Sequence, residues 1–275
     1  MLKNNVLCGI GAPSQTAGGS GSEHLSEAKM IGFADGEQSR ASGLRELNGA
    51  SPNNHPANGH AHGVRIRNYW ESDRKAVHQL CCDTGFLGSP IDHVFQDREL
   101  FAALFARPYL DQEPEWALVA EAHGQVVGYL LGSIGKDFEL ARLRGDIQTA
   151  CQMVFRLATG RYARHRRSRQ FVRWVLASGF WEQPKHPKDA AHFHFNIHKH
   201  YRGRGLGRRL WKVYEERLHS AGVKQCYGAF FSCPQRRPES VYARYGFTVF
   251  DRRQTTLFAP EVRDPVECVC MHKRL

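Results

Sequence analysis

Short runs in which apolar and polar residues alternate predict strands from Gly63 onward. The predicted strands cover residues 64–67, 116–121, 126–131, 191–198, 223–231, 247–250 and 266–271. His123 and Gly124 stand between the second and third runs, which predicts a tight turn and an antiparallel hairpin.

Apolar residues spaced three or four positions apart predict helices between these strands. The helical stretches cover residues 76–80, 99–105, two stripes within 138–180, 206–218 and 239–245. Pro108 is expected to end the second helix, and Gly246 the last. The order of elements predicts an α/β chain with a mixed sheet rather than a repeating β–α–β array.

Residues 1–62 differ in composition from the rest of the chain, since they are rich in Gly, Ser, Asn, Ala and His. Such a segment cannot bury enough apolar surface to offset the entropy of ordering, so we expect it to be disordered. His55, His60 and His62 could in principle bind a metal, but a flexible tail is the preferred interpretation and no metal site is expected. One folded domain, residues 63–275, is expected to follow.

No apolar run approaches the roughly 20 residues that a membrane-spanning helix needs. The N-terminus also lacks the basic region and hydrophobic stretch of a secretory signal. The 8 cysteines are scattered, and none forms a Cys-x-x-Cys pair. We therefore expect reduced thiols, a cytoplasmic protein and no membrane partner.

The formal net charge of +11 is distributed unevenly along the chain. No acidic residue lies between Asp146 and Glu182, whereas this stretch contains Arg156, Arg161, Arg164, Arg166, Arg167, Arg169 and Arg173. Such a patch attracts polyanions, which include a phosphorylated cofactor, an acidic substrate and nucleic acid. The alternative is a solvated helix face that lies beside the protein's own carboxylates.

A glycine-rich turn, Arg202-Gly203-Arg204-Gly205-Leu206-Gly207, stands between a predicted strand and a predicted helix. Glycines let a backbone approach a ligand closely, and the amides at a helix N-terminus favour anions. The turn lacks the Gly-Lys-Ser/Thr of a Walker A loop and the Gly-x-Gly-x-x-Gly spacing of a dinucleotide site. It does fit the pattern Arg/Gln-x-x-Gly-x-Gly/Ala.

By this pattern the chain resembles the GNAT superfamily of N-acetyltransferases, whose motif of this form binds the pyrophosphate of coenzyme A. A second motif agrees, because Val241-Tyr242 followed by Gly246-Phe247 matches the family's aliphatic-Tyr-x-x-x-Gly-Phe. Gln235 stands where Asn is commoner in the family, and Pro238 where Ala is commoner. The strand at 191–197 looks more narrowly like the acetyltransferase-like domains related to the one fused to protein O-GlcNAcase.

The resemblance implies a GNAT-like, mostly antiparallel central sheet flanked by helices, with a basic helical insertion at about 138–182 before the cofactor-binding strand. It implies an enzyme that transfers an acetyl group from acetyl-CoA to a primary amine by direct attack. Tyr242 takes the position of the family's usual general acid. Carried over to this sequence, the cofactor-binding residues are Ile197, His198, Arg202, Gly203, Arg204, Gly205, Leu206, Gly207 and Arg208.

The general base is sought on the strand before the turn, where His192, His194, Asn196 and His198 alternate and so project from one face. A histidine titrates near neutrality and can accept the ammonium proton directly or through water. His194 is the preferred base and His192 the second choice. Glu121, near the end of the hairpin's first strand, is the rival.

Two other functions stay open beside acetyl transfer. One is a non-catalytic acyl-CoA-binding or interaction module with the same fold. The other, less favoured, is nucleic-acid binding through the arginine patch, with Tyr162, Phe171 and Trp174 as stacking groups. If the basic stretch instead covers the acceptor cleft, it would favour an anionic acceptor. The acceptor itself stays open among an amino sugar, a small amine, a peptide N-terminus and a protein lysine.

Overall fold

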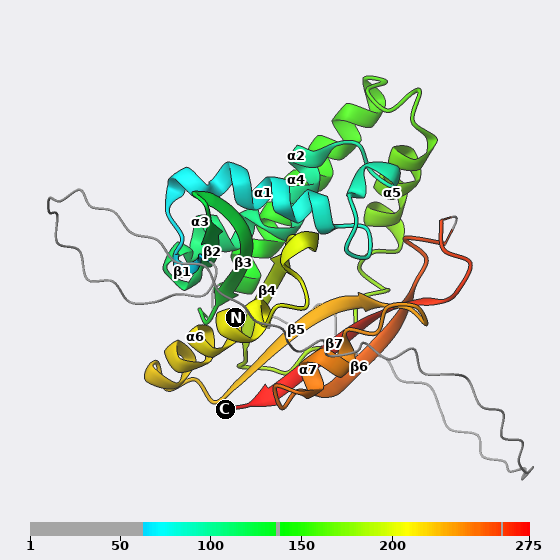
Figure 1. The fold of residues 1–275 in the computed structure, drawn as a ribbon. Helices are drawn as coiled ribbons and strands as arrows, with labels where there is room; N and C mark the ends of the chain where they lie inside the picture. The colour runs from blue at the N-terminus through cyan, green and yellow to red at the C-terminus, as the bar shows by residue number, and fades with distance from the viewer. Residues whose placement is uncertain (1–62, 136–137, 260) are drawn as a thin grey trace, which may run out of the picture. The chain divides into compact units, whose positions relative to one another are not determined.

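The computed structural model of the chain describes residues 63–135, 138–259 and 261–275. Its centre is a seven-stranded sheet in the order β1-β2-β3-β4-β5-β7-β6 (Figure 1). All neighbouring strands are antiparallel except β4 and β5, which are parallel. The strands are β1 Val64–Asn68, β2 Leu118–Ala122, β3 Gln125–Ser133, β4 Ala191–Ile197, β5 Gln225–Ser232, β6 Thr248–Thr255 and β7 Val266–Arg274. The expected mixed, mostly antiparallel sheet is confirmed.

The predicted disordered segment 1–62, with the histidines His55, His60 and His62, lies outside the described residues. Within them, no helix has the length and apolar composition that crossing a membrane requires. The α-helices are α1 Arg74–Thr84, α2 Arg98–Phe105, α3 Arg107–Gln112, α4 Phe138–Ala158, α5 Arg166–Ala177, α6 Leu206–Ser220 and α7 Glu239–Ala243. Short 3-10 helices cover Glu71–Asp73, Ile91–His93, Pro114–Trp116 and Lys199–Tyr201.

The two faces of the sheet bury two separate apolar cores. Helices α1 to α5 pack on one face, where Tyr129 and Leu131 of β3 point into the core. Helix α6 packs on the other face, and Leu130 between those two residues points toward it. This alternation follows from the period of two along a strand. Figure 1 shows α1, α2, α4 and α5 on one side of the sheet and α6 and α7 on the other.

Local signals in the sequence locate several of these elements. The hairpin between β2 and β3 turns at His123 and Gly124, whose φ angles of 50° and 73° are both positive, as a tight hairpin turn requires. The expectation that Pro108 ends a helix was wrong. The helix α2 ends earlier, and Pro108 stands in the first turn of α3, where its missing N–H costs nothing.

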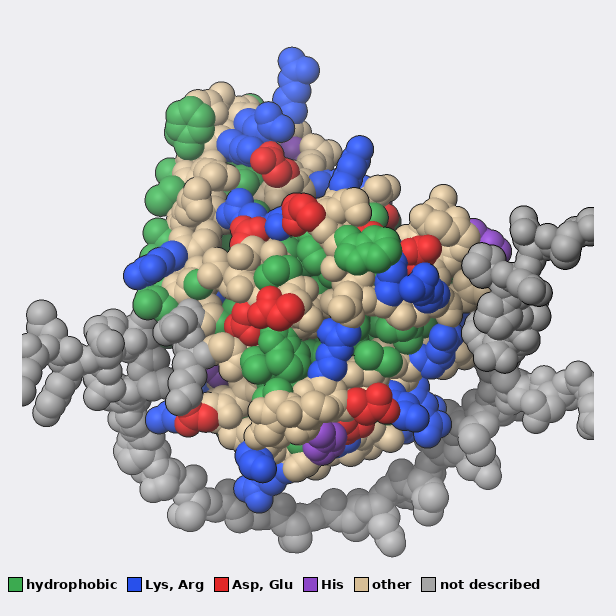
Figure 2. All heavy atoms as spheres, turned by 90° about the vertical axis from the view of Figure 1, so that its left-hand side faces the viewer, with side chains coloured by type: hydrophobic (Ala, Val, Ile, Leu, Met, Phe, Trp, Pro, Cys, Tyr) green, Lys and Arg blue, Asp and Glu red, His purple; other side chains and the backbone are tan. Residues whose placement is uncertain are grey.

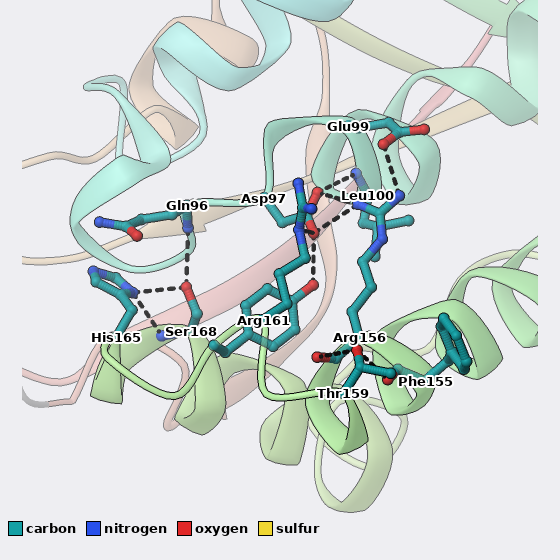
Figure 3. Close-up of polar contacts among 11 residues, drawn as sticks. Gln96, Asp97, Glu99, Leu100, Phe155, Arg156, Thr159, Arg161, His165 and Ser168 are labelled. Atoms are coloured by element: carbon teal, nitrogen blue, oxygen red, sulfur yellow. Dashed lines mark hydrogen bonds and ion pairs between the residues drawn. The ribbon is translucent and has the colours of Figure 1, made fainter.

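Asp97 fixes the paired helices α4 and α5 to the start of α2 (Figure 3). Its buried carboxylate accepts hydrogen bonds from Arg156 at 2.7 Å and from the Tyr162 hydroxyl at 2.6 Å. Burial by itself would raise the pKa of Asp97, but the hydrogen bonds from Tyr162 and Arg156 outweigh it and lower that pKa. The helical stretch at 138–182 is therefore attached to the domain through a buried ionic contact.

Candidate active site

The strands β4 and β5 separate soon after they begin to pair. Their parallel register contains only Ala191 opposite Cys226 and His192 opposite Tyr227, although both strands continue for several residues. Figure 1 shows the two strands diverging. Beyond His192, the edge of β4 that faces β5 is consequently left without a strand partner.

The backbone of β4 presents only every second amide to this open edge. His198 donates its N–H to Val127 at 2.9 Å, which makes this pair a hydrogen-bonded one in the β3–β4 ladder. Because such pairs alternate along antiparallel strands, the N–H groups of Phe195 and Ile197 point away from β3. Ile197 is therefore placed as the sequence interpretation requires. The N–H of His198 does not face the open edge, because it donates to Val127 of β3.

The glycine-rich turn follows β4 and begins α6 at Leu206. Gly203 and Gly205 have φ angles of 76° and 73°, in the left-handed region that favours glycine. A Cβ atom at either position would meet nothing within 4 Å, so the space beside the turn is open. Among the described residues, none accepts a hydrogen bond from the backbone N–H groups of residues 203–208. The turn thus presents consecutive free donors at a helix N-terminus, as an anion site requires.

The arginines of the turn have different surroundings. Arg202 donates to the carbonyl oxygens of Ile197 and Gly88, both at 2.8 Å, so its guanidinium holds the turn against the rest of the domain. Arg204 lies over the ring of Tyr201, 5.9 Å from its centroid, and does not line the cavity described next. Arg208 is exposed and does line it.

A cavity of about 800 Å³ brings the separate sequence motifs together. It is lined by the turn at Gly203, Gly205, Leu206, Gly207 and Arg208, by the diverging part of β4, and by Tyr242 of α7. His192 and His194 line it from the α1–α5 side of the sheet, as do Phe105 and Tyr109. The cavity therefore reaches both faces of the sheet through the gap between β4 and β5.

Tyr242 reaches the cavity from the α6 side. Its ring stacks on Phe230 with centroids 4.6 Å apart, and it also contacts the rings of Phe193 and Phe195. Burial raises the pKa of Tyr242, so the hydroxyl stays protonated at neutral pH. None of the described residues hydrogen-bonds this hydroxyl, which leaves its proton available to a bound molecule.

The two histidines of β4 differ in what their ring nitrogens contact. In His194, Nδ1 donates to the carbonyl oxygen of Phe105 at 2.9 Å, and Nε2 accepts from Asn196 at 3.2 Å. Burial lowers the pKa of His194 to about 4. Both nitrogens of this ring are occupied by the protein itself, which is the arrangement of a structural histidine.

In His192, Nδ1 lies 2.8 Å from the Tyr109 hydroxyl, whereas Nε2 has only a weaker contact of 3.4 Å with the same group. The ring stacks on Tyr227, which stacks in turn on His186, so the imidazole is held in one plane. Burial lowers the pKa of His192 well below its usual value, which keeps the ring neutral. Of the two histidines, His192 has the freer nitrogen.

Glu121 is not brought together with these residues. It lies on β2, does not line the cavity, and its carboxylate pairs with Arg67 at 2.6 Å. Arg67 also binds the buried Asp73, so Glu121 belongs to an ion-pair cluster formed by β1, β2 and the 3-10 helix that contains Asp73. The ion pair with Arg67 gives Glu121 a structural role, and its place outside the cavity lining argues against Glu121 as the base.

The arginine patch at 156–173 also lies apart from the cavity lining. Arg156 and Arg161 pair with Asp97, and Arg167 pairs with Glu261. Tyr162 and Phe171 are buried in the core, so they offer no stacking surface. For these three arginines, the interpretation that the patch lies beside the protein's own carboxylates fits the contacts. An anionic acceptor gains no support from the patch.

Several cavity-lining residues were not singled out in the sequence, among them Tyr109, Arg142 and Arg236. Tyr109 follows the misjudged Pro108, Arg142 lies on α4, and Arg236 lies before α7, where its guanidinium donates to the carbonyl oxygen of Phe231 at 2.7 Å. No spacing rule connects them to the motifs, because each reaches the cavity through tertiary packing. Among the described residues, no group of three or more His, Cys, Asp or Glu side chains could hold a metal ion.

Solved structures with a similar fold include SsHAT, which is 24% identical over 77% of this chain and 98% of that chain, with a TM-score of 0.49. The Escherichia coli ribosomal-protein-S18-alanine N-acetyltransferase is 12% identical over 77% and 93%, with a TM-score of 0.44. A Sinorhizobium meliloti phosphinothricin acetyltransferase in complex with acetyl-CoA is 14% identical over 77% and 88%, with a TM-score of 0.45. These are likenesses of fold alone.

A search of curated proteins found no match to the sequence. The narrower resemblance to O-GlcNAcase-related domains is not shown by any of these comparisons and stays a prediction. Residues 179–257 match the family described as the acetyltransferase (GNAT) domain. This range contains β4, the glycine-rich turn, α6, β5 and Tyr242, and the match supports acetyl transfer as the general reaction. Residues 179–257 therefore belong to the acetyltransferase (GNAT) domain family, in agreement with the resemblance that the sequence motifs indicate.

Proposed function

We propose that this protein transfers the acetyl group of acetyl-CoA to a primary amine by direct attack, within one GNAT domain over residues 63–275 that contains the helical insertion at 138–182. The observation that carries the proposal is the cavity between β4 and β5. It joins an anion-binding turn, free strand amides, a protonated tyrosine and a neutral histidine in one space.

Coenzyme A would enter from the α6 side of the sheet. Its pyrophosphate would accept hydrogen bonds from the amides between Gly203 and Arg208, assisted by the positive end of the α6 dipole. Its pantetheine arm would lie along the open edge of β4 and pair with the backbone of Phe195 and Ile197. One of these two amides would polarise the thioester oxygen.

The acceptor amine would approach from the α1–α5 side, through the same gap. Its nitrogen attacks the thioester carbon, the tetrahedral intermediate collapses, and the bond between that carbon and sulfur breaks. The leaving thiolate would take the proton of the Tyr242 hydroxyl as the carbon–sulfur bond breaks, and the phenolate would regain a proton from solvent before the next turnover. The products are the acetylated amine and coenzyme A.

His192 is the proposed base, in preference to His194. With Nδ1 bonded to the Tyr109 hydroxyl, Nε2 can keep a lone pair and take the proton that the attacking nitrogen loses, directly or through water. Tyr109 would act as a positioning residue, because its hydroxyl can accept the Nδ1–H of this tautomer and hold the ring in place. His194 would support the strand through Phe105 and Asn196.

Binding of the cofactor is tested by calorimetry with acetyl-CoA on the full chain. Gly205→Asp and Gly205→Asn form a matched pair, since both residues tolerate the left-handed conformation and differ in charge. We expect Gly205→Asp to abolish measurable binding and Gly205→Asn to weaken it much less. Equal affinity of the two variants would contradict the location of the pyrophosphate.

Turnover is tested by release of free thiol over a panel of amino sugars, small amines, peptides and lysine-containing proteins. Tyr242→Phe should lower kcat about 10²-fold or more with nearly unchanged acetyl-CoA affinity. His192→Gln should lower kcat, whereas His194→Gln, once folded, should keep most of it. Binding of acetyl-CoA without turnover on any amine would favour the non-catalytic module, and full activity of Tyr242→Phe at every pH would remove this residue from the mechanism.

A further inference from the structure

Helix α4 carries a continuous stripe of apolar side chains on its outer face. Leu140, Leu143, Ile147, Val154 and Phe155 are 52%, 53%, 56%, 45% and 68% exposed, and the exposed Cys151 lies among them. The opposite side of the helix supplies Phe138 and Met153 to the core. Figure 2 shows hydrophobic side chains exposed along the upper left edge of the molecule. A soluble surface rarely leaves such a stripe unused.

The spacing of this stripe is that of a helix that packs against another helix. The positions 140, 143, 147, 151 and 154 follow steps of three and four, which places them on one side of the helix. The steps are also symmetric about Ile147. In an antiparallel pair of identical helices centred there, Leu140 faces Val154, Leu143 faces Cys151, and Ile147 faces its own copy.

We propose that α4 packs against α4 of a second copy of this chain, antiparallel and around a two-fold axis at Ile147. A two-fold interface requires a self-complementary surface, and the symmetric stripe is one. The proposal is independent of the acetyl-transfer mechanism, because no residue of the stripe lines the cavity.

The charges beside the stripe and its apolar area agree with a second copy of the chain as the partner. At the same register Arg144 faces Ala150 and Asp146 faces Gln148, so no like charges meet. Arg142 pairs with Glu139 and Asp146 of its own helix, at 3.4 Å and 3.8 Å. The five large side chains offer roughly 400–500 Å² of apolar surface per copy. Together with the polar residues beside them, this approaches the roughly 800 Å² per partner of a stable interface.

The mass of the full chain, measured by sedimentation equilibrium, tests the proposal. We expect a dimer for the wild type and a monomer for Ile147→Glu, whose dissociation constant should rise at least about 100-fold because two carboxylates would meet at the axis. Leu176→Glu is the matched control, since Leu176 is a 50% exposed apolar residue on α5 outside the stripe. It should leave the dimer intact. Circular dichroism shows whether each variant is folded.

Crosslinking tests the antiparallel register separately. With Cys151→Ser as background, Ile147→Cys should form a disulfide with its own copy under mild oxidation, and Leu140→Cys should not, because it faces position 154. A monomeric wild type, or a dimer that survives Ile147→Glu, would overturn the proposal. So would a disulfide at position 140, because that position faces its own copy only when the two helices are parallel. A monomer in which the thiol introduced by Ile147→Cys resists alkylation would instead show that another part of the same chain covers the stripe.

Discussion

The contact between Asp97 and Arg156 should contribute measurably to the free energy of unfolding, because it attaches the helices α4 and α5 to α2. Asp97→Asn removes the negative charge and keeps the shape of the side chain. The carboxylate of Asp97 is only 3% exposed and that of Glu99 is 75% exposed, although both bind the guanidinium of Arg156. The two carboxylates therefore differ in burial while sharing a partner.

The expected loss follows from that difference. Removing one partner of a buried ion pair costs about 3–5 kcal/mol, because the other charge is left without compensation. Arg156 keeps Glu99 and is 21% exposed, so we expect the lower end of this range, about 3 kcal/mol, for Asp97→Asn. Glu99→Gln, the matched control, should cost less than about 0.5 kcal/mol, as an exposed pair does.

Urea denaturation at pH 7 measures both variants as shifts of the midpoint at an unchanged slope. The pH dependence adds a second test. Since the pKa of Asp97 is lowered in the folded state, its contribution is present above the unfolded value near 3.9 and is lost as the pH falls through the folded value. The difference between wild type and Asp97→Asn should therefore shrink below about pH 4. Equal stabilities of Asp97→Asn and Glu99→Gln at pH 7 would refute the reasoning.

Three further predictions concern the sheet and the turn. Gly228→Ala should destabilise the protein by about 1–3 kcal/mol in urea, because a Cβ there would lie 2.7 Å from the ring of Phe193; an unchanged midpoint would contradict this contact. Because His194 has a pKa of about 4 when folded and near 6.5 when unfolded, wild-type stability should fall as the pH drops from 6.5 to 4. His194→Gln should flatten that slope by up to about 1.4 kcal/mol per pH unit, and an identical slope would argue against a buried neutral ring. Arg202→Lys should weaken acetyl-CoA binding about tenfold in calorimetry, because it releases the turn from the carbonyl oxygens of Ile197 and Gly88. Arg204→Lys, the control, should leave the affinity unchanged. Equal effects of the two substitutions would mean that only the charge of the turn matters.

The elements predicted correctly are those whose signals are local. His123 and Gly124 define a hairpin because a tight turn needs positive φ angles, and the glycine-rich turn is recognised because its residues are adjacent in the chain. The strand β6 was predicted only as far as Phe250. It continues to Thr255 as an edge strand whose polar residues 251–254 show no apolar alternation, although they pair with β7.

The parts of the site that could not be predicted depend on contacts between distant segments. Whether His192 or His194 has a free nitrogen is decided by Tyr109 and Phe105, which lie more than 80 positions earlier in the chain. The amide of His198 is used because β3 and β4 pair in one particular register, which no pattern within β4 alone reveals.

The divergence of β4 and β5 means that the central sheet consists of two half-sheets, β1-β2-β3-β4 and β5-β7-β6, which are joined by only two residue pairs. A pantetheine arm lying between the half-sheets would act as a missing strand and connect them through its amides. Cofactor binding would then be part of the architecture as well as of the chemistry. The relative motion of the half-sheets should decrease on binding, and the unfolding temperature should rise with acetyl-CoA concentration as mass action requires.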